Sequence, residues 1–377
     1  MRRALLAVVT AVAMGLAPAP ALADPDWALV PDDAPAADGQ QGQSGRPAKG
    51  SPASGRYAPW RPALPGPARV VSERRLSARV LDVLVSSPSI GRMLPVRLLL
   101  PRGWSKSAKR TWPVLYLLHG GADDYTSWTR MTDVEAMTEN VGAIVVMPEA
   151  GRAGNYSDWH NRGRGGPPRW ETFHTYEVRR LLEIGYRAGA RRAVAGLSMG
   201  AYGAMKYAAR HPGMFRFVGA YSGIMATQLP GIPELIMNAQ ASEKQDPLAL
   251  WGDPRRDKKV WNANDPLALA PGLRGTSIYI SSGTTSFHGP LDPPGSPWHP
   301  AHLGEPVSAY TAKALSRRLR SLGIAHTLNL YGNGTHTWPY WRREFQNSFP
   351  MILAALGLPG GGPAKVTHEQ DDWRLAG

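Results

Sequence analysis

The stretch AVAGLSMGAYGAMKYAAR at residues 193–210 decides the fold of this chain. The apolar run Ala193–Ala195 precedes the pentapeptide Gly196-Leu197-Ser198-Met199-Gly200, and a segment with one apolar helical face follows it. A strand, the pattern G-x-S-x-G and a helix in this order are typical of a nucleophile elbow, a sharp turn that lifts a serine above the end of a sheet. Glycines flank the serine because side chains there would crowd the turn. We therefore predict that Ser198 is a catalytic nucleophile.

Apolar runs on both sides of this stretch predict the rest of a sheet. Helical patterns separate most of the later runs, for example residues 201–210 and Val307–Leu322, and such alternation is typical of parallel strands covered on both faces. The sequence thus predicts the α/β class, and specifically an α/β-hydrolase fold with a mostly parallel central sheet and helices on both faces. We expect the first two strands to pair as a hairpin. The predicted strands are Val80–Val85, Val96–Leu100, Val114–Leu118, Ala143–Met147, Ala193–Ala195, Phe217–Tyr221, Ser277–Ser281 and Thr327–Tyr331.

A glycine pair at the end of the third predicted strand marks a candidate oxyanion hole. The segment reads Leu118-His119-Gly120-Gly121-Ala122, which is where this fold supplies its second oxyanion donor. We predict that the backbone N–H groups of Gly121 and Met199 bind the oxyanion. His119 precedes the serine, so we interpret it as a structural or substrate-binding residue rather than as the base.

The base and the acid should follow the serine in the order acid, then histidine. His336, in the loop after the last predicted strand, is the candidate base. Two carboxylates are candidates for the acid: Glu305, at the start of a predicted helix, and Asp292, in a proline-rich loop. The residues alone leave this choice open.

An apolar run follows the strand after the serine helix. Its pattern is compatible with an acyl-binding pocket and equally with ordinary core packing. The run consists of Ile224, Met225, Leu229, Ile232, Leu235, Ile236 and Met237.

The two ends of the chain differ in composition from the middle. Residues 1–23 combine Arg2 and Arg3, an apolar run and a small-residue cleavage pattern, which predicts a signal peptide and a secreted or cell-wall-associated protein. Residues 24–68 are rich in Pro, Ala and Gly and are expected to be a flexible linker. The hydrolase domain is expected at 69–359 and a loose tail at 360–377.

Composition excludes several classes of function. The sequence has no cysteine, which removes thiol chemistry and cysteine metal sites. No metal-ligand cluster or dinucleotide fingerprint stands out, so we expect neither a metal nor a cofactor. The net charge of +14 comes from scattered residues without a nucleic-acid-binding fingerprint. This charge is compatible with peripheral contact with an anionic cell envelope, or simply with a solvated basic surface.

Several further segments resemble the antigen 85 mycolyltransferases, within the esterase D-like group of α/β-hydrolases. They are Ser87-Pro88-Ser89-Ile90-Gly91-Arg92, Asp123-Asp124-Tyr125-Thr126-Ser127-Trp128, Tyr156-Ser157-Asp158-Trp159, Trp170-Glu171-Thr172-Phe173, Asn264-Asp265-Pro266 and Gly334-Thr335-His336-Thr337-Trp338. The resemblance covers about residues 76–356. It implies a triad of Ser198, Glu305 and His336, since its glutamate falls within one residue of Glu305. It also implies that Trp338 lies beside an acceptor-sugar site.

Two positions depart from that family's pattern: His119 stands where the family has an aspartate that binds sugar, and Ala122 where it has an arginine. The family's cysteines are also absent. The expected function is a serine esterase or acyltransferase that forms a covalent acyl-enzyme from a small-molecule acyl ester, with water or a sugar hydroxyl as acceptor. The alternative is a non-catalytic envelope- or matrix-binding protein on the same scaffold.

Overall fold

The computed structural model describes residues 67–365, and the sheet forms the centre of this part of the chain. Its strands are β1 (Arg69–Arg75), β2 (Val80–Ser87), β3 (Arg92–Leu99), β4 (Trp112–Leu118), β5 (Ile144–Pro148), β6 (Ala188–Leu197), β7 (Phe217–Tyr221), β8 (Ser277–Ser282) and β9 (Thr327–Leu330). The helices and helical turns are α2 (Ser127–Met131), α3 (Val134–Met137), η1 (Asn161–Gly163), α4 (Trp170–Thr172), η2 (Phe173–Val178), α5 (Arg179–Gly185), α6 (Met199–Arg210), α7 (Ile232–Ser242), α8 (Lys258–Ala263), α9 (Pro266–Leu269), η3 (Ala270–Leu273), η4 (Pro300–Leu303), α10 (Gly304–Ser321) and α11 (Trp338–Leu356).

The strands form one mixed sheet in the order β1-β2-β3-β5-β4-β6-β7-β8-β9. The pairs β1–β2, β2–β3 and β3–β5 are antiparallel. The pairs β5–β4, β4–β6, β6–β7, β7–β8 and β8–β9 are parallel. The predicted hairpin of β2 and β3 is confirmed, and so is the mostly parallel α/β sheet. In a parallel sheet the loops that follow the strands gather at one edge, which is where this fold assembles its site.

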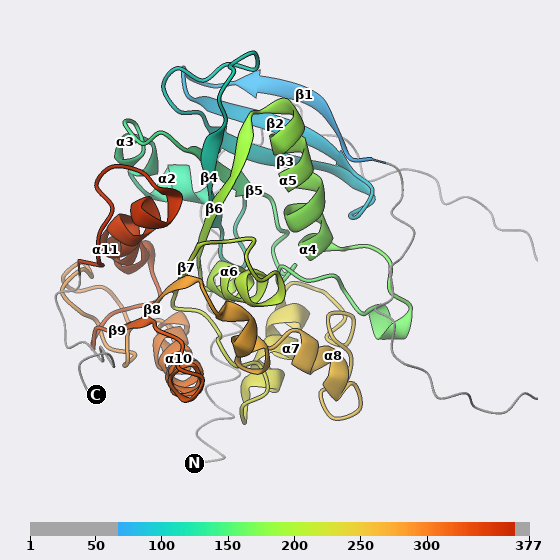
Figure 1. The fold of residues 1–377 in the computed structure, drawn as a ribbon. Helices are drawn as coiled ribbons and strands as arrows, with labels where there is room; N and C mark the ends of the chain where they lie inside the picture. Colours follow the sequence, from blue (N-terminus) through green and yellow to red (C-terminus); the bar gives the residue numbers. More distant parts are fainter. Residues whose placement is uncertain (1–66, 366–377) are drawn as a thin grey trace, which may run out of the picture. The chain divides into compact units, whose positions relative to one another are not determined.

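Helices cover both faces of the sheet because successive strand residues point to opposite sides. On β4, Leu115 and Leu117 pack with α2 and α11, whereas Val114 and Tyr116 belong to the apolar cluster on the other face, with α5, α6 and α10. Figure 1 shows α11, α2 and α3 on one side of the sheet and α5, α6 and α10 on the other. The near-continuous apolar strands of the sequence follow from this double covering.

β1 is the strand that the sequence analysis missed. Its residues, RVVSERR, are mostly exposed, and it pairs only with β2, at the edge of the sheet. A charged edge strand lacks the apolar run that identifies a buried one, and its charges protect the open edge from pairing with another chain.

The expected signal peptide and almost all of the expected linker lie outside the described residues. Of the expected C-terminal tail, the structure describes residues up to 365. This portion is attached to α11, because the N–H of Gly362 donates to Pro350 O at 3.0 Å and that of Lys365 donates to Asn347 O at 2.8 Å. No helix within residues 67–365 has the length and apolar character needed to cross a membrane.

A buried ion pair supports the serine helix from behind. Lys206, in the middle of α6, is fully buried, and its Nζ lies 3.1 Å from Glu171 Oε2 and donates to Tyr156 O at 2.6 Å. Although burial alone would raise the pKa of Glu171, the positive charges of Lys206 and Arg210 and a hydrogen bond from His211 hold that pKa well below its ordinary value. The carboxylate is therefore charged in the folded protein at neutral pH and fixes α6 against the segment around Glu171.

We predict that Glu171→Gln destabilises the protein by about 3 kcal/mol at pH 7, because it leaves the Lys206 ammonium buried without its counter-ion. A carboxylate whose pKa is lower in the folded than in the unfolded protein stabilises the fold at pH values above its unfolded pKa, which is near 4.5 for Glu171. This contribution is lost as the pH falls below that value. The difference in free energy of unfolding between wild type and variant should therefore become smaller below about pH 4.5. Urea unfolding at pH 7, 5, 4 and 3 measures it, with Glu234→Gln, an exposed carboxylate on α7, as the control. A gap that widens on acidification would contradict this reading of the pair.

Candidate active site

Ser198 occupies the turn between β6 and α6 with a positive φ of 51° and a ψ of −118°, a combination that is rare for a residue with a side chain. The turn is possible because two glycines surround it. A Cβ on Gly196 would lie 2.3 Å from Gly200 O, and a Cβ on Gly200 would lie 2.4 Å from Leu118 O. The G-x-S-x-G spacing is therefore a steric requirement, and the strain at Ser198 is held by the packing of β4, β6 and α6.

The His336 side chain lies between Ser198 and Glu305. Ser198 Oγ is 2.9 Å from His336 Nε2, and His336 Nδ1 is 2.8 Å from Glu305 Oε1. These bonds assign the proton of the neutral ring to Nδ1, where it is donated to the carboxylate, and leave Nε2 to accept the serine proton. The structure thus brings together the three residues that the sequence proposed as nucleophile, base and acid.

The carboxylate of Glu305 is fully buried and anchored by groups from three separate strand ends. Its Oε2 accepts hydrogen bonds from the Gly283 N–H at 2.5 Å, from the Ser222 hydroxyl at 3.0 Å and from the Tyr331 hydroxyl at 3.0 Å. Burial, and then the charge of Glu305, raise the pKa of Tyr331 well above its ordinary value, so its hydroxyl keeps the proton that it donates. These partners leave Oε1 for His336. Sequence reasoning missed them because serine, glycine and tyrosine carry no spacing signal for this role.

Close packing fixes the ring of His336. A Cβ on Gly304 would lie 2.9 Å from His336 Cγ, and the Trp341 ring meets the imidazole edge to face with centroids 4.9 Å apart. Gly304 immediately precedes Glu305 at the start of α10, so the first turn of this helix supplies both the carboxylate and the space for the histidine.

Asp292, the rival candidate for the acid, lies beside the histidine loop and bonds to other residues of it. Its carboxylate accepts hydrogen bonds from the Thr335 hydroxyl, from Tyr340 Oη at 2.6 Å and from the Gly289 N–H at 2.8 Å. No bond joins it to His336 in the described residues. Asp292 therefore holds the loop that carries the histidine, whereas Glu305 contacts the imidazole itself.

The two proposed oxyanion donors lie next to each other at the mouth of the site. Gly121 and Met199 line the same pocket as Ser198, and a Cβ on Gly121 would lie 3.9 Å from the Cβ of Met199. Met199 is the first residue of α6, so its N–H points out of the helix N-terminus, where negative charge is stabilised.

The two proposed substrate-binding residues do not line this pocket. His119 is only 1% exposed, its Nδ1 donates to Gly120 O at 2.7 Å, and its Nε2 accepts from the Ala150 N–H at 3.0 Å. It braces the loop after β4, and a substrate contact would require its ring to move. Trp338 is half-buried and packs edge to face on Trp128 and Trp341.

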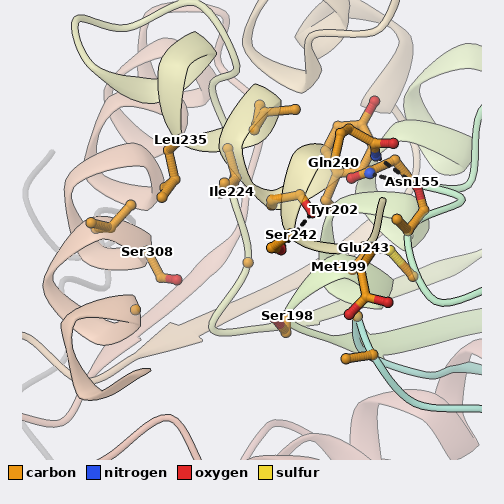
Figure 2. A pocket seen from close by; sticks show the side chains of 18 of the residues that line it. Asn155, Ser198, Met199, Tyr202, Ile224, Leu235, Gln240, Ser242, Glu243 and Ser308 are labelled. Carbon is orange, nitrogen blue, oxygen red and sulfur yellow. Dashed lines mark hydrogen bonds between the residues drawn. The ribbon is translucent and has the colours of Figure 1, made fainter. Parts of the chain in front are cut away.

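The pocket above Ser198 has a cavity volume of about 150 Å³ and is lined by residues of α6, α7 and α10 and of the loops that follow β4, β5 and β7. Of the apolar run in the sequence, Ile224, Leu235 and Ile236 line it, whereas the remaining four residues belong to or pack against the core. The run therefore contributes both to the pocket and to the core, the two alternatives that its sequence pattern left open. Figure 2 shows Leu235 and Ile224 on one side of the pocket, with Gln240 and Asn155 grouped on another. Within residues 67–365, no cluster of His, Cys, Asp or Glu is arranged to hold a metal ion.

Comparison with known proteins agrees with this geometry. The model of the family described as "Putative esterase" matches residues 87–352. A protein of Mycobacterium tuberculosis named diacylglycerol acyltransferase/mycolyltransferase Ag85A is 31% identical over 291 residues, which are 74% of this chain and 82% of that protein. The Ag85B protein of Mycolicibacterium smegmatis is 30% identical over 288 residues, which are 73% of this chain and 85% of that protein.

Solved structures give the same result. MPT51 (FbpC1) of Mycobacterium tuberculosis superimposes with a TM-score of 0.61 at 25% identity, over 74% of this chain and 99% of that one. FphF, a fluorophosphonate-binding serine hydrolase of Staphylococcus aureus, superimposes with a TM-score of 0.55 at 18% identity, over 77% of this chain and 99% of that one. At this identity the likeness supports the fold assignment alone. The chain has the α/β-hydrolase fold and is an enzyme of the serine hydrolase and acyltransferase class: it belongs to the esterase family that includes the antigen 85 mycolyltransferases.

Proposed function

We propose that Ser198, His336 and Glu305 form the catalytic triad of an enzyme that transfers an acyl group from a small-molecule ester. The observation that carries this proposal is the continuous hydrogen-bond chain from Ser198 Oγ through the imidazole to the buried Glu305 carboxylate, at the base of a pocket. Such a chain activates a serine that is a weak nucleophile on its own.

In the acylation step, Ser198 Oγ attacks the ester carbonyl carbon while His336 Nε2 takes the hydroxyl proton. The carbonyl oxygen becomes an oxyanion, which the N–H groups of Gly121 and Met199 bind. The C–O bond to the alcohol then breaks, and the imidazolium returns its proton to the leaving alkoxide. Glu305 remains ionised throughout and stabilises the imidazolium.

The second half-reaction reverses these roles. The acceptor hydroxyl, from water or from a sugar, loses its proton to His336 and attacks the acyl-enzyme, and Ser198 recovers its proton as the acyl product leaves. The antigen 85 proteins are named for transfer of mycolyl groups and for acylation of diacylglycerol, which favours a hydroxyl acceptor other than water. His119 and Ala122 replace the polar pair of the family's sugar site, so the acceptor here need not be the same.

The apolar walls suit the acyl chain of the ester. Ile224, Leu235 and Ile236 face the cavity, and burial of methylene groups against them contributes about 0.8 kcal/mol for each CH₂. The sequence features of residues 1–23 support secretion, and the basic net charge supports contact with an anionic cell envelope, where acyl esters of lipids and sugars would be available.

We predict that Ser198→Ala lowers kcat on a medium-chain p-nitrophenyl ester by at least about 10⁴-fold, because the covalent route is lost. Mass spectrometry of the products, with and without trehalose or glucose, identifies the acceptor: acylated sugar made only by the wild type supports transfer, and free fatty acid alone supports hydrolysis. A Ser198→Ala protein that keeps full activity would refute the proposal, and a wild type that a fluorophosphonate fails to label would favour a binding protein instead.

The choice of acid is tested by a pair of variants. Glu305→Gln should lower kcat about 10³- to 10⁴-fold, since an amide neither stabilises the imidazolium nor holds the ring in the required tautomer. Asp292→Asn should lower kcat by less than about tenfold, since Asp292 acts only on the loop. Active-site titration with a fluorophosphonate corrects both values for the folded fraction. A larger loss in Asp292→Asn than in Glu305→Gln would reverse the assignment.

A further inference from the structure

Arg152, in the loop after β5, holds the residue that follows the proposed oxyanion donor Gly121. The N–H of Ala122 donates to Arg152 O at 2.8 Å, and Nη1 of the Arg152 guanidinium donates to Ala122 O at 2.8 Å. One residue therefore binds both the donor and the acceptor of the Ala122 main chain. Arg152 also lines the Ser198 pocket, as Gly121 and Ala122 do.

The backbone of Ala122 requires such support. Its φ is 57°, a positive value that residues with a side chain adopt rarely because of steric crowding. A residue stays in a conformation of this kind only where the surrounding structure imposes it. If Ala122 rotated toward an ordinary φ, the preceding residue, Gly121, would move with it. The position of the Gly121 N–H therefore depends on the two bonds that Arg152 makes to Ala122.

This contact lies next to both proposed oxyanion donors. A Cβ placed on Gly121 would lie 3.6 Å from Arg152 O and 3.9 Å from the Cβ of Met199. Arg152 thus packs directly against the residue that supplies one donor, and that residue in turn packs against the other. Figure 2 shows Met199 and Glu243, the ion-pair partner of Arg152, on the opposite side of the pocket from Leu235.

Glu243, at the C-terminal end of α7, fixes the plane of the Arg152 guanidinium. Its carboxylate accepts hydrogen bonds from Arg152 Nε at 2.7 Å and from Nη2 at 3.1 Å. Because the guanidinium is planar and rigid, these two bonds leave Nη1 directed at Ala122 O. The side chain of Arg152 is 54% exposed and that of Glu243 is 20% exposed. An exposed ion pair contributes little to global stability, so its loss should affect the loop rather than the fold.

We propose that Arg152 is a positioning residue of the oxyanion hole: its guanidinium, oriented by Glu243, keeps Ala122 and hence the Gly121 N–H in place. The inference rests on the proposed function, which assigns the oxyanion to the N–H groups of Gly121 and Met199. Arg152 acts through Gly121 and takes part in none of the bond changes. Its effect belongs to the transition state, in which the oxyanion carries charge, and binding of the uncharged ester should not depend on it.

The main variant is Arg152→Met, which keeps an unbranched side chain and removes all three guanidinium hydrogen bonds. Pre-steady-state release of p-nitrophenolate from a medium-chain ester gives both the acylation rate constant and the Kd of the ester. We expect the rate constant to fall about tenfold, because a misplaced donor loses only part of the contribution of a complete one. The Kd should stay within about twofold. An unchanged rate constant, or a change confined to the Kd, overturns the proposal.

A second measurement uses a stable tetrahedral anion. When an alkylboronic acid binds, Ser198 Oγ adds to boron, His336 takes the serine proton, and a hydroxyl on the negatively charged boron occupies the oxyanion hole. Such an analogue of the transition state depends on the oxyanion donors as the reaction does. The inhibition constant should therefore rise about tenfold in Arg152→Met, in step with the loss of acylation rate. Equal inhibition constants in wild type and variant would contradict the positioning role even if acylation slows.

Two further variants separate geometry from charge. Arg152→Lys keeps the positive charge, but an ammonium lacks the planar fork that binds Ala122 O and both Glu243 oxygens together, so its loss should approach that of Arg152→Met. Glu243→Gln keeps an acceptor for the guanidinium and leaves the bond from Arg152 to Ala122 O, so it should lower the acylation rate only about threefold. A wild-type rate in Arg152→Lys would show that charge alone is sufficient and would overturn the proposal.

Arg162 provides the matched control. Its side chain is 52% exposed and forms a two-pronged pair with Asp246, and neither residue lines the Ser198 pocket. Arg162→Met should leave the acylation rate and the boronic acid inhibition unchanged, and an equal loss in both methionine variants overturns the proposal. Fluorophosphonate labelling and ester turnover of the wild type report on the proposed function, whereas the ratio of variant to wild-type rate reports on Arg152. A labelled, active wild type with a ratio of one would refute this inference alone.

Discussion

The buried carboxylate of Glu305 is the interaction on which the site depends. A charge with no solvent exposure is stable only if protein groups replace its water, and here they come from the segments that follow β7, β8 and β9. One carboxylate therefore ties three strand ends to the first turn of α10, and its remaining oxygen orients His336. The same burial strengthens the interaction with the imidazole, because little water is present to screen it.

Backbone geometry holds Ser198 in its position. Its positive φ is tolerated because Gly196 and Gly200 allow β6, α6 and the end of β4 to approach closely. Behind the helix, the Lys206–Glu171 pair replaces hydrophobic packing with a buried charge pair that has fixed partners. Such pairs contribute little net stability but permit few alternative arrangements, and α6 must not shift if Ser198 is to stay 2.9 Å from His336.

The pocket favours hydrocarbon groups because much of its lining is apolar. Its apolar side offers burial to any hydrocarbon chain of suitable size, which gives affinity but poor discrimination between chains. Family membership gives the class of chemistry, acyl transfer from an ester to water or a hydroxyl. The side chains around this cavity, among them Ala122, determine which ester and which acceptor it takes.

The sequence by itself determined the fold class and singled out Ser198 and His336 as the candidate nucleophile and base, because each leaves a local signal. Apolar strands, the G-x-S-x-G turn and a histidine after the last strand follow from short-range geometry. The charged edge strand β1 left no such signal. The residues alone left Glu305 and Asp292 open as the acid, and the family resemblance favoured Glu305. The tertiary structure places Glu305 against His336, because the two carboxylates lie in the same stretch of chain and only their folded positions differ. It also assembled Ser222, Gly283 and Tyr331 around that carboxylate and divided the apolar run between pocket and core. These are contacts between residues far apart in sequence, and no local pattern encodes them.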